Sequence, residues 1–167
     1  MPGFIDELTP LYRHEVERHH NRPFLEAAMA ACALVATARG IVTFAHRTRI
    51  DQILETLDAL KIFDPHEGVE IFNEYAEEIL EHPREGRARA MTAIHDVARD
   101  PDTARLLVRL CLAVSEMNDA TSLADQIEIV MLCDHIGTDP SDLGLYVDNE
   151  PEAIRAGDVL PSIRRMH

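Results

Sequence analysis

The chain has 167 residues, which suits one domain with a substantial core, and 46% of them are hydrophobic, which excludes an intrinsically disordered protein. Its formal net charge of −14 disfavours binding to nucleic acid or to an anionic membrane surface, and leaves cations, basic partners or plain solubility as explanations of the charge. Aromatic residues make up only 5% and Trp is absent, so Ala, Leu, Ile, Val and Met must build the core, a composition typical of helical bundles.

The first segment, residues 4–20, has the pattern of a polar helix with few apolar anchors. It contains RHEVERHH, in which Glu17 and His20 are spaced to share one helix face. The Glu-x-x-His spacing occurs in di-iron carboxylate bundles, but those need a second copy, and the sequence shows none. We expect a solvated helix end and keep a metal-dependent helical enzyme with a carboxylate/His centre as an alternative. No signal peptide is expected, because a basic segment and an apolar segment are both missing.

The next segment, residues 24–38, is apolar on nearly every face, which predicts a helix buried in the core. Arg39-Gly40 ends it, because glycine accepts the left-handed conformation found after helix C-termini. Thr43 is a suitable N-terminal cap for a second helix. The apolar residues of that second helix fall on one face, at Ile50, Ile53, Leu54 and Leu57. The longest apolar run, residues 27–38, is too short to span a bilayer.

Two linking helices are predicted in the middle of the chain. Asp64-Pro65 combines an N-terminal cap with a proline in the first turn, and starts the first of them. His82-Pro83 interrupts the pattern before the second, at residues 84–98. Asp100-Pro101 then starts a second buried helix, which ends at the Asn118-Asp119 turn. Proline and capping residues therefore divide the chain into helices along its whole length.

The second buried helix and the helix after it repeat the pattern of the first pair. Cys111 takes the place of Cys32, and at the same offset the four apolar residues of the second helix match Ile129, Leu132, Cys133 and Ile136. We predict an all-α fold, a compact bundle of about seven to eight helices built on a duplicated helical hairpin. The repeat halves lie at about 23–64 and 100–143, within one domain at 1–147, and a polar tail follows at 148–167. All three cysteines fall in helical patterns and indicate small buried residues, with a redox pair as the alternative.

From about residue 23 to residue 143 the chain resembles the TerB-like tellurite resistance proteins. In that family each buried helix ends in Ala-Asp-Gly, followed by a hydrophobic position, a Ser or Thr cap, and a Glu one turn into the next helix. The stretches that carry the resemblance are ALVATARGIVTFAH, residues 33–46, and AVSEMNDATSLAD, residues 113–125. It implies a compact all-α stress-response protein that is not an enzyme. It also implies a cytoplasmic protein that works with a membrane partner of the TerC type and reaches the inner membrane through it.

The resemblance further implies a divalent-cation site at the paired turns. Arg39 and His46 stand where the family has Asp and Glu, and Asn118, Asp119 and Asp125 stand where the second turn has Asp, Gly and Glu. Oxygen ligands from these last three residues suit Ca²⁺ or Mg²⁺, whereas His46 with Asp119 and Asp125 suits Zn²⁺. The metal candidates are therefore His46, Asn118, Asp119 and Asp125.

Other interpretations of the turns remain open. Ser, Thr, Asp and Asn after a buried helix are ordinary caps, and Arg39 can replace a cation by pairing with Asp119 or Asp125. No nucleophile–base pair or phosphate-binding loop points to catalysis. A protein-interaction module without a small ligand, such as a homodimer, is the remaining alternative. The position of Arg39 relative to Asp119 and Asp125 separates a cation site from an internal ion pair.

Overall fold

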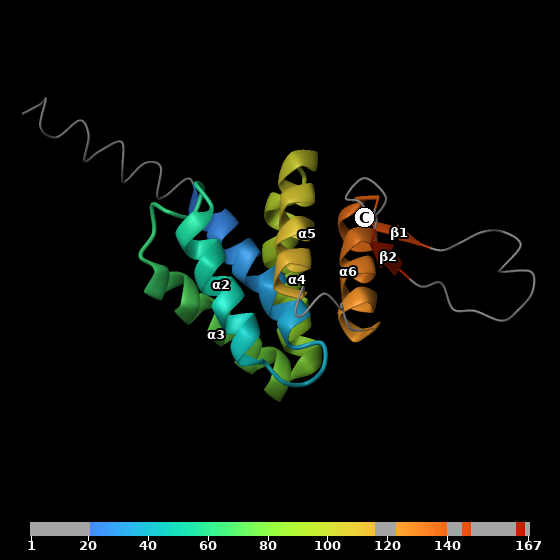
Figure 1. The fold of residues 1–167 in the computed structure, drawn as a ribbon, viewed down its shortest axis with the longest axis horizontal. Helices are drawn as coiled ribbons and strands as arrows, with labels where there is room; N and C mark the ends of the chain where they lie inside the picture. Colours follow the sequence, from blue (N-terminus) through green and yellow to red (C-terminus); the bar gives the residue numbers. More distant parts are fainter. Residues whose placement is uncertain (1–20, 116–122, 140–144, 148–162, 166–167) are drawn as a thin grey trace, which may run out of the picture.

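The computed structural model describes residues 21–115, 123–139, 145–147 and 163–165. Within these ranges the chain forms six helices and one pair of short strands, so the predicted helical class is confirmed (Figure 1). A first helix runs through residues 21–36. It is followed by α2 (Phe44–Thr56), α3 (Pro65–Glu81), α4 (Pro83–Val97), α5 (Pro101–Ser115) and α6 (Leu123–Ile136). None of the described helices combines the length with the apolar composition that crossing a bilayer requires.

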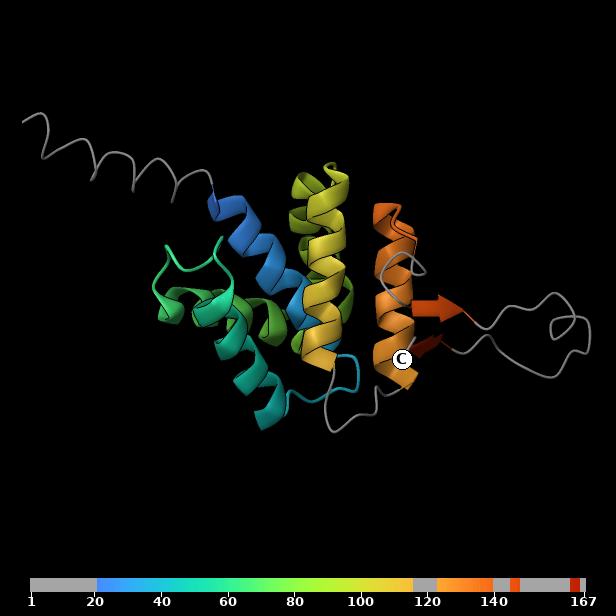
Figure 2. The ribbon, with the colours of Figure 1, turned by 45° about the horizontal axis from the view of Figure 1, so that its top comes forward.

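The first helix forms the centre of the core, as its apolar faces predict. Every residue from Ala27 to Ala36 is at most 2% exposed. The helix passes between α2 and α3 on one side and α4 and α5 on the other (Figure 2). Its alanines leave room for these neighbours to approach, while Leu25 and Met29 are among its larger buried side chains. Burial of a side chain of that size stabilises the fold by about 1.5–3 kcal/mol.

The helix boundaries follow the local signals in the sequence. The Asp64 carboxylate accepts a backbone N–H from the first turn of α3, and Pro83 and Pro101 begin α4 and α5. Gly40 has a φ angle of 83°, the left-handed conformation predicted for it, but the first helix ends at residue 36 and a turn at 37–39 comes before the glycine. Gly137, directly after α6, has a φ angle of 71°. The helix starts at Asp64, Pro83 and Pro101 are confirmed, and each depends on residues within one turn of it.

The α3 and α4 helices are joined by a single residue and pack against each other. Gly86 of α4 lies against the backbone of α3, and a Cβ atom at this position would come within 2.6 Å of the Ile79 backbone nitrogen. The absence of a side chain at Gly86 therefore allows the two helices to approach so closely. This contact holds α4 in place as one wall of the pocket described below.

The positions that the sequence pairs across its two halves are buried alike. Cys32 and Cys111 are both fully buried. Each half has four matched apolar residues, of which the first three are buried and the fourth is half-buried. In the first half they are Ile50, Ile53, Leu54 and Leu57, and in the second half they are Ile129, Leu132, Cys133 and Ile136. The duplicated hairpin itself stays a prediction, because the second turn, residues 116–122, lies outside the described residues. The predicted helices at 4–20 and after residue 139 also fall outside them, wholly or in part.

A pair of strands near the C-terminal end was not predicted. β1 (Leu145–Val147) and β2 (Ile163–Arg165) pair in antiparallel register, and β2 falls within the segment that the sequence analysis assigned to a polar tail. Each strand has three residues, too few to produce the alternation of polar and apolar residues by which a strand is recognised. The rest of the predicted tail lies outside the described residues.

Candidate functional site

The turn after the first helix lies beside the first turn of α6. The Nε atom of Arg39 is 3.9 Å from Oδ1 of Asp125. The Arg39 side chain is 39% exposed, whereas that of Asp125 is 2% exposed, so the guanidinium covers a buried carboxylate from the solvent side. Residues distant in sequence therefore meet here, in the pairing that the ion-pair alternative expects between Arg39 and Asp125.

His46 lies in the same place and closes the first turn of α2. The Thr43 hydroxyl accepts the backbone N–H of His46 at 3.2 Å, and the backbone N–H of Thr43 donates to Nδ1 of His46 at 3.1 Å. This reciprocal pair is a capping box in which His replaces the usual Glu or Gln. The sequence predicted Thr43 as the cap but missed the part that the His46 side chain takes in it. His46 is fully buried.

The capping box decides which nitrogen of His46 carries the proton. Because Nδ1 accepts a hydrogen bond, the neutral ring must carry its proton on Nε2. That Nε2 atom has no hydrogen-bond partner among the described residues. Burial lowers the pKa of His46 below its ordinary value; the nearby Asp125 charge acts to raise it and the Arg39 charge to lower it. We call Arg39, His46 and Asp125 the turn cluster.

The turn cluster contains two of the four predicted metal ligands, His46 and Asp125. The other two, Asn118 and Asp119, lie outside the described residues, so the predicted cation site stays a prediction. Within the described ranges no group of three or more His, Cys, Asp and Glu side chains is arranged to hold a metal ion. Glu17 and His20, the residues of the alternative enzyme centre, also lie outside those ranges.

The described residues of the turn cluster do not fit a cation well. A metal bound at Nε2 needs a lone pair there, so the His46 proton would have to move to Nδ1, where it would face the Thr43 N–H. The Asp125 carboxylate already has the Arg39 guanidinium beside it. A divalent cation would add positive charge beside a carboxylate that already has the Arg39 charge next to it. The arrangement fits an internal ion pair next to a neutral histidine better.

A second buried acid anchors α6, and sequence reasoning missed it. Glu128, one turn after Asp125, forms an ion pair with Arg87 of α4 at 2.6 Å. Glu128 is nearly buried, and Arg87 is about as exposed as Arg39. Two acidic residues at helical spacing among the apolar residues of α6 were the available signal, because buried carboxylates require partners. Each of these acids is thus matched by an arginine from another part of the bundle.

The three cysteines are free and buried, as predicted for small core residues. Burial raises the pKa of the Cys32 thiol to about 12 and that of the Cys133 thiol to about 11. Burial likewise raises the pKa of Cys111 well above its ordinary value. Thiols that stay protonated are poor nucleophiles, so the structure gives no support to the alternative of a redox pair.

The chain is similar to the tellurium resistance protein TerB of an Alcaligenes species. The two are 28% identical over 105 residues, which cover 63% of this chain and 83% of that protein. This relative confirms the resemblance inferred from the two turns. No protein-family model matches the chain. No solved structure matches it either.

Proposed function

We propose that this protein is a TerB-like, non-enzymatic component of a tellurite resistance system. The observation that carries the proposal is the similarity to tellurium resistance protein TerB, which extends over 83% of that relative. The helical architecture agrees with the fold that the resemblance implies. The contact between Arg39 and Asp125 supports the proposal, because it joins one residue from each of the two stretches that carry the resemblance.

In this proposal the protein acts in the cytoplasm by binding another protein, a TerC-type partner in the inner membrane. The formal net charge of −14 supports such a role. Cytoplasmic loops of membrane proteins are enriched in Lys and Arg, so an acidic surface attracts them and speeds their encounter. The duplicated hairpin belongs to the same proposal, and the matched burial of its two halves supports it.

We further infer that Arg39 supplies the positive charge that a divalent cation would otherwise bring to the turn cluster. Metal analysis of the purified protein, after exposure to Ca²⁺, Mg²⁺ or Zn²⁺ and desalting, tests this inference. We expect substoichiometric metal in the wild type and no change in Asp125→Ala or His46→Ala. Stoichiometric metal that either substitution removes would instead establish the cation site predicted at His46, Asn118, Asp119 and Asp125.

The biological role is tested by growth on tellurite. A strain that lacks the gene should tolerate less tellurite than its parent, and the wild-type gene should restore tolerance. Asp125→Asn tests the turn cluster, and Asp134→Asn provides a control with the same charge change at an exposed position of α6. Equal growth of the parent and the deletion strain at every tellurite concentration would remove the proposed role.

A further inference from the structure

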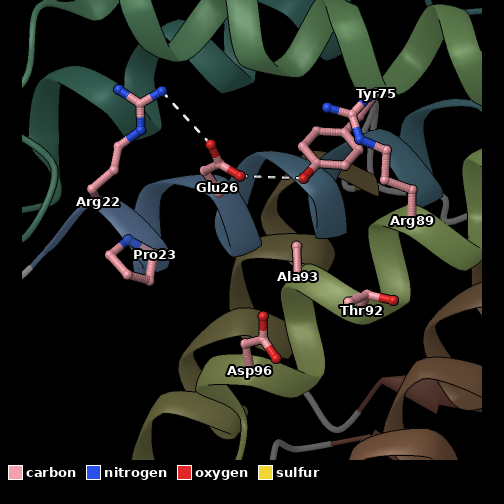
Figure 3. A pocket seen from close by; sticks show the side chains of 8 residues that line it. All are labelled: Arg22, Pro23, Glu26, Tyr75, Arg89, Thr92, Ala93 and Asp96. Atoms are coloured by element: carbon pink, nitrogen blue, oxygen red, sulfur yellow. Dashed lines mark hydrogen bonds and ion pairs between the residues drawn. The ribbon is translucent and has the colours of Figure 1, made fainter.

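A pocket of about 440 Å³ opens between the first helix, α3 and α4 (Figure 3). It lies towards the start of the first helix, whereas the turn cluster lies beyond the end of that helix. Its volume falls in the range of about 300–1,000 Å³ that is usual for small-molecule sites. The proposed tellurite role makes no use of this pocket.

The two positive side chains of the pocket already have acidic partners. Arg22 forms ion pairs with Glu67 and, at 3.6 Å, with Glu26. Arg89 forms an ion pair with Glu78 at 2.7 Å, and its guanidinium carbon lies 4.8 Å from the centre of the Tyr75 ring. Neither guanidinium therefore presents an uncompensated charge to an anionic ligand.

The two negative side chains of the pocket are less well satisfied. Asp96 has no hydrogen bond or ion pair with any of the described residues. Glu26 makes two long contacts, one to Arg22 and one from the Tyr75 hydroxyl at 3.4 Å. Asp96 also lies in the last turn of α4, where the helix dipole adds partial negative charge. Together with Glu67 and Glu78, these carboxylates outnumber the two guanidiniums by four to two, so the uncompensated charge around the pocket is negative.

The carboxylates of Glu26 and Asp96 lie on opposite sides of the hollow, and the apolar side chains of Pro23 and Ala93 lie between them (Figure 3). A ligand that satisfies both ends needs positive charge at its termini and an apolar middle. A metal ion lacks the apolar part, and an anion would meet two carboxylates. We propose that this pocket binds a small organic cation with an aliphatic stem, of the diamine or alkylguanidine class.

In the bound state one ammonium or guanidinium group lies against Asp96, and the stem packs on Pro23 and Ala93. The second charged end lies near Glu26, where the Tyr75 hydroxyl can turn to accept a hydrogen bond from it. Because the pocket is open and the carboxylates are partly exposed, each charge contact contributes modestly, and we expect about a fivefold loss of affinity when one is removed.

The proposal is tested by NMR titration of the full-length chain at low ionic strength with three probes: 1,4-diaminobutane, butylamine and uncharged 1,4-butanediol. We expect the diamine to shift backbone amide signals in the last turns of α4 and near Glu26, butylamine to bind more weakly, and the diol to have no effect. Equal responses to the diamine and the diol would overturn the proposal. Inorganic phosphate is a fourth probe, and saturable binding of phosphate in place of the diamine would also overturn it.

Three variants locate the site. Asp96→Asn should weaken diamine binding about fivefold. Asp51→Asn, with the same charge change at an exposed position of α2, should leave it unchanged. Ala93→Lys places a tethered alkylammonium in the pocket and should abolish binding. If Asp51→Asn weakens binding as much as Asp96→Asn, the diamine is held only by the net charge of the protein and the pocket proposal is wrong. Asp96 is exposed, so its substitution should leave the fold intact, and circular dichroism tests whether each variant is folded.

Discussion

Loss of the Arg39 charge should destabilise the fold, because it removes the positive charge that lies beside the buried Asp125 carboxylate. At their separation of 3.9 Å, two unit charges interact by about 1 kcal/mol in water and by about 4 kcal/mol at an effective permittivity of about 20. Arg39 is 39% exposed, so solvent screening places the interaction near the lower value. We therefore expect a coupling free energy of about 1–1.5 kcal/mol between the two side chains.

A double-mutant cycle measures this coupling. Urea unfolding of the wild type, Arg39→Gln, Asp125→Asn and the double variant gives the pairwise term, and added salt should reduce it. Arg109→Gln, at an exposed position of α5, replaces Arg39→Gln in a control cycle and should show no coupling to Asp125→Asn. A coupling below about 0.3 kcal/mol, the scatter of independent sites, would refute the ion pair as a stabilising contact.

Three further predictions follow from the same structure. His46→Gln keeps an acceptor for the capping box but cannot be protonated. Because the folded-state pKa of His46 is lowered, the unfolded chain binds the proton first as pH falls through about 6.5, and the wild type loses stability by at most about 1.4 kcal/mol per pH unit from this group. The variant should lose less in urea titrations at pH 7 and 5, and identical losses would contradict the assignment. Gly86→Ala should lower the free energy of unfolding by about 1–3 kcal/mol, because its Cβ meets the backbone of α3. The higher helix propensity of alanine offsets about 1 kcal/mol of this loss. In Gly68→Ala the new Cβ meets only the branched end of the Leu54 side chain, so this variant should lose less stability. A lower melting temperature for Gly68→Ala than for Gly86→Ala would contradict the close α3–α4 contact. Cys32 and Cys133, with pKa values raised to about 12 and about 11, should react with a thiol reagent only after urea unfolding, and fast labelling of the native protein would show that the core opens.

The residues of the turn cluster could be predicted from the sequence, but their positions relative to one another could not. The resemblance to the TerB-like proteins singled out Arg39, His46 and Asp125, because each stands where that family has Asp or Glu. The pattern left open whether Arg39 pairs with an acid, since that depends on how two turns distant in sequence pack together. The Arg87–Glu128 pair was missed for the same reason.

The pocket between the first helix, α3 and α4 could not have been found in the sequence at all. Glu26 and Asp96 each look like ordinary charges on a helix surface, where most carboxylates are solvated. They face one hollow because α4, which packs against α3, brings its last turns beside the first helix. A local sequence pattern does not show which distant residues lie close together in the fold.

The sequence by itself determined the helical class, the buried first helix, the helix starts at Asp64, Pro83 and Pro101, and the left-handed conformation of Gly40. Each of these features depends on residues within a turn or two of one another, so capping, proline geometry and hydrophobic periodicity are sufficient to predict them. Tertiary structure alone decided that Arg39 lies beside Asp125 and that the capped His46 ring is buried close to both charges. These outcomes depend on the packing of distant segments and on which buried polar groups then become partners.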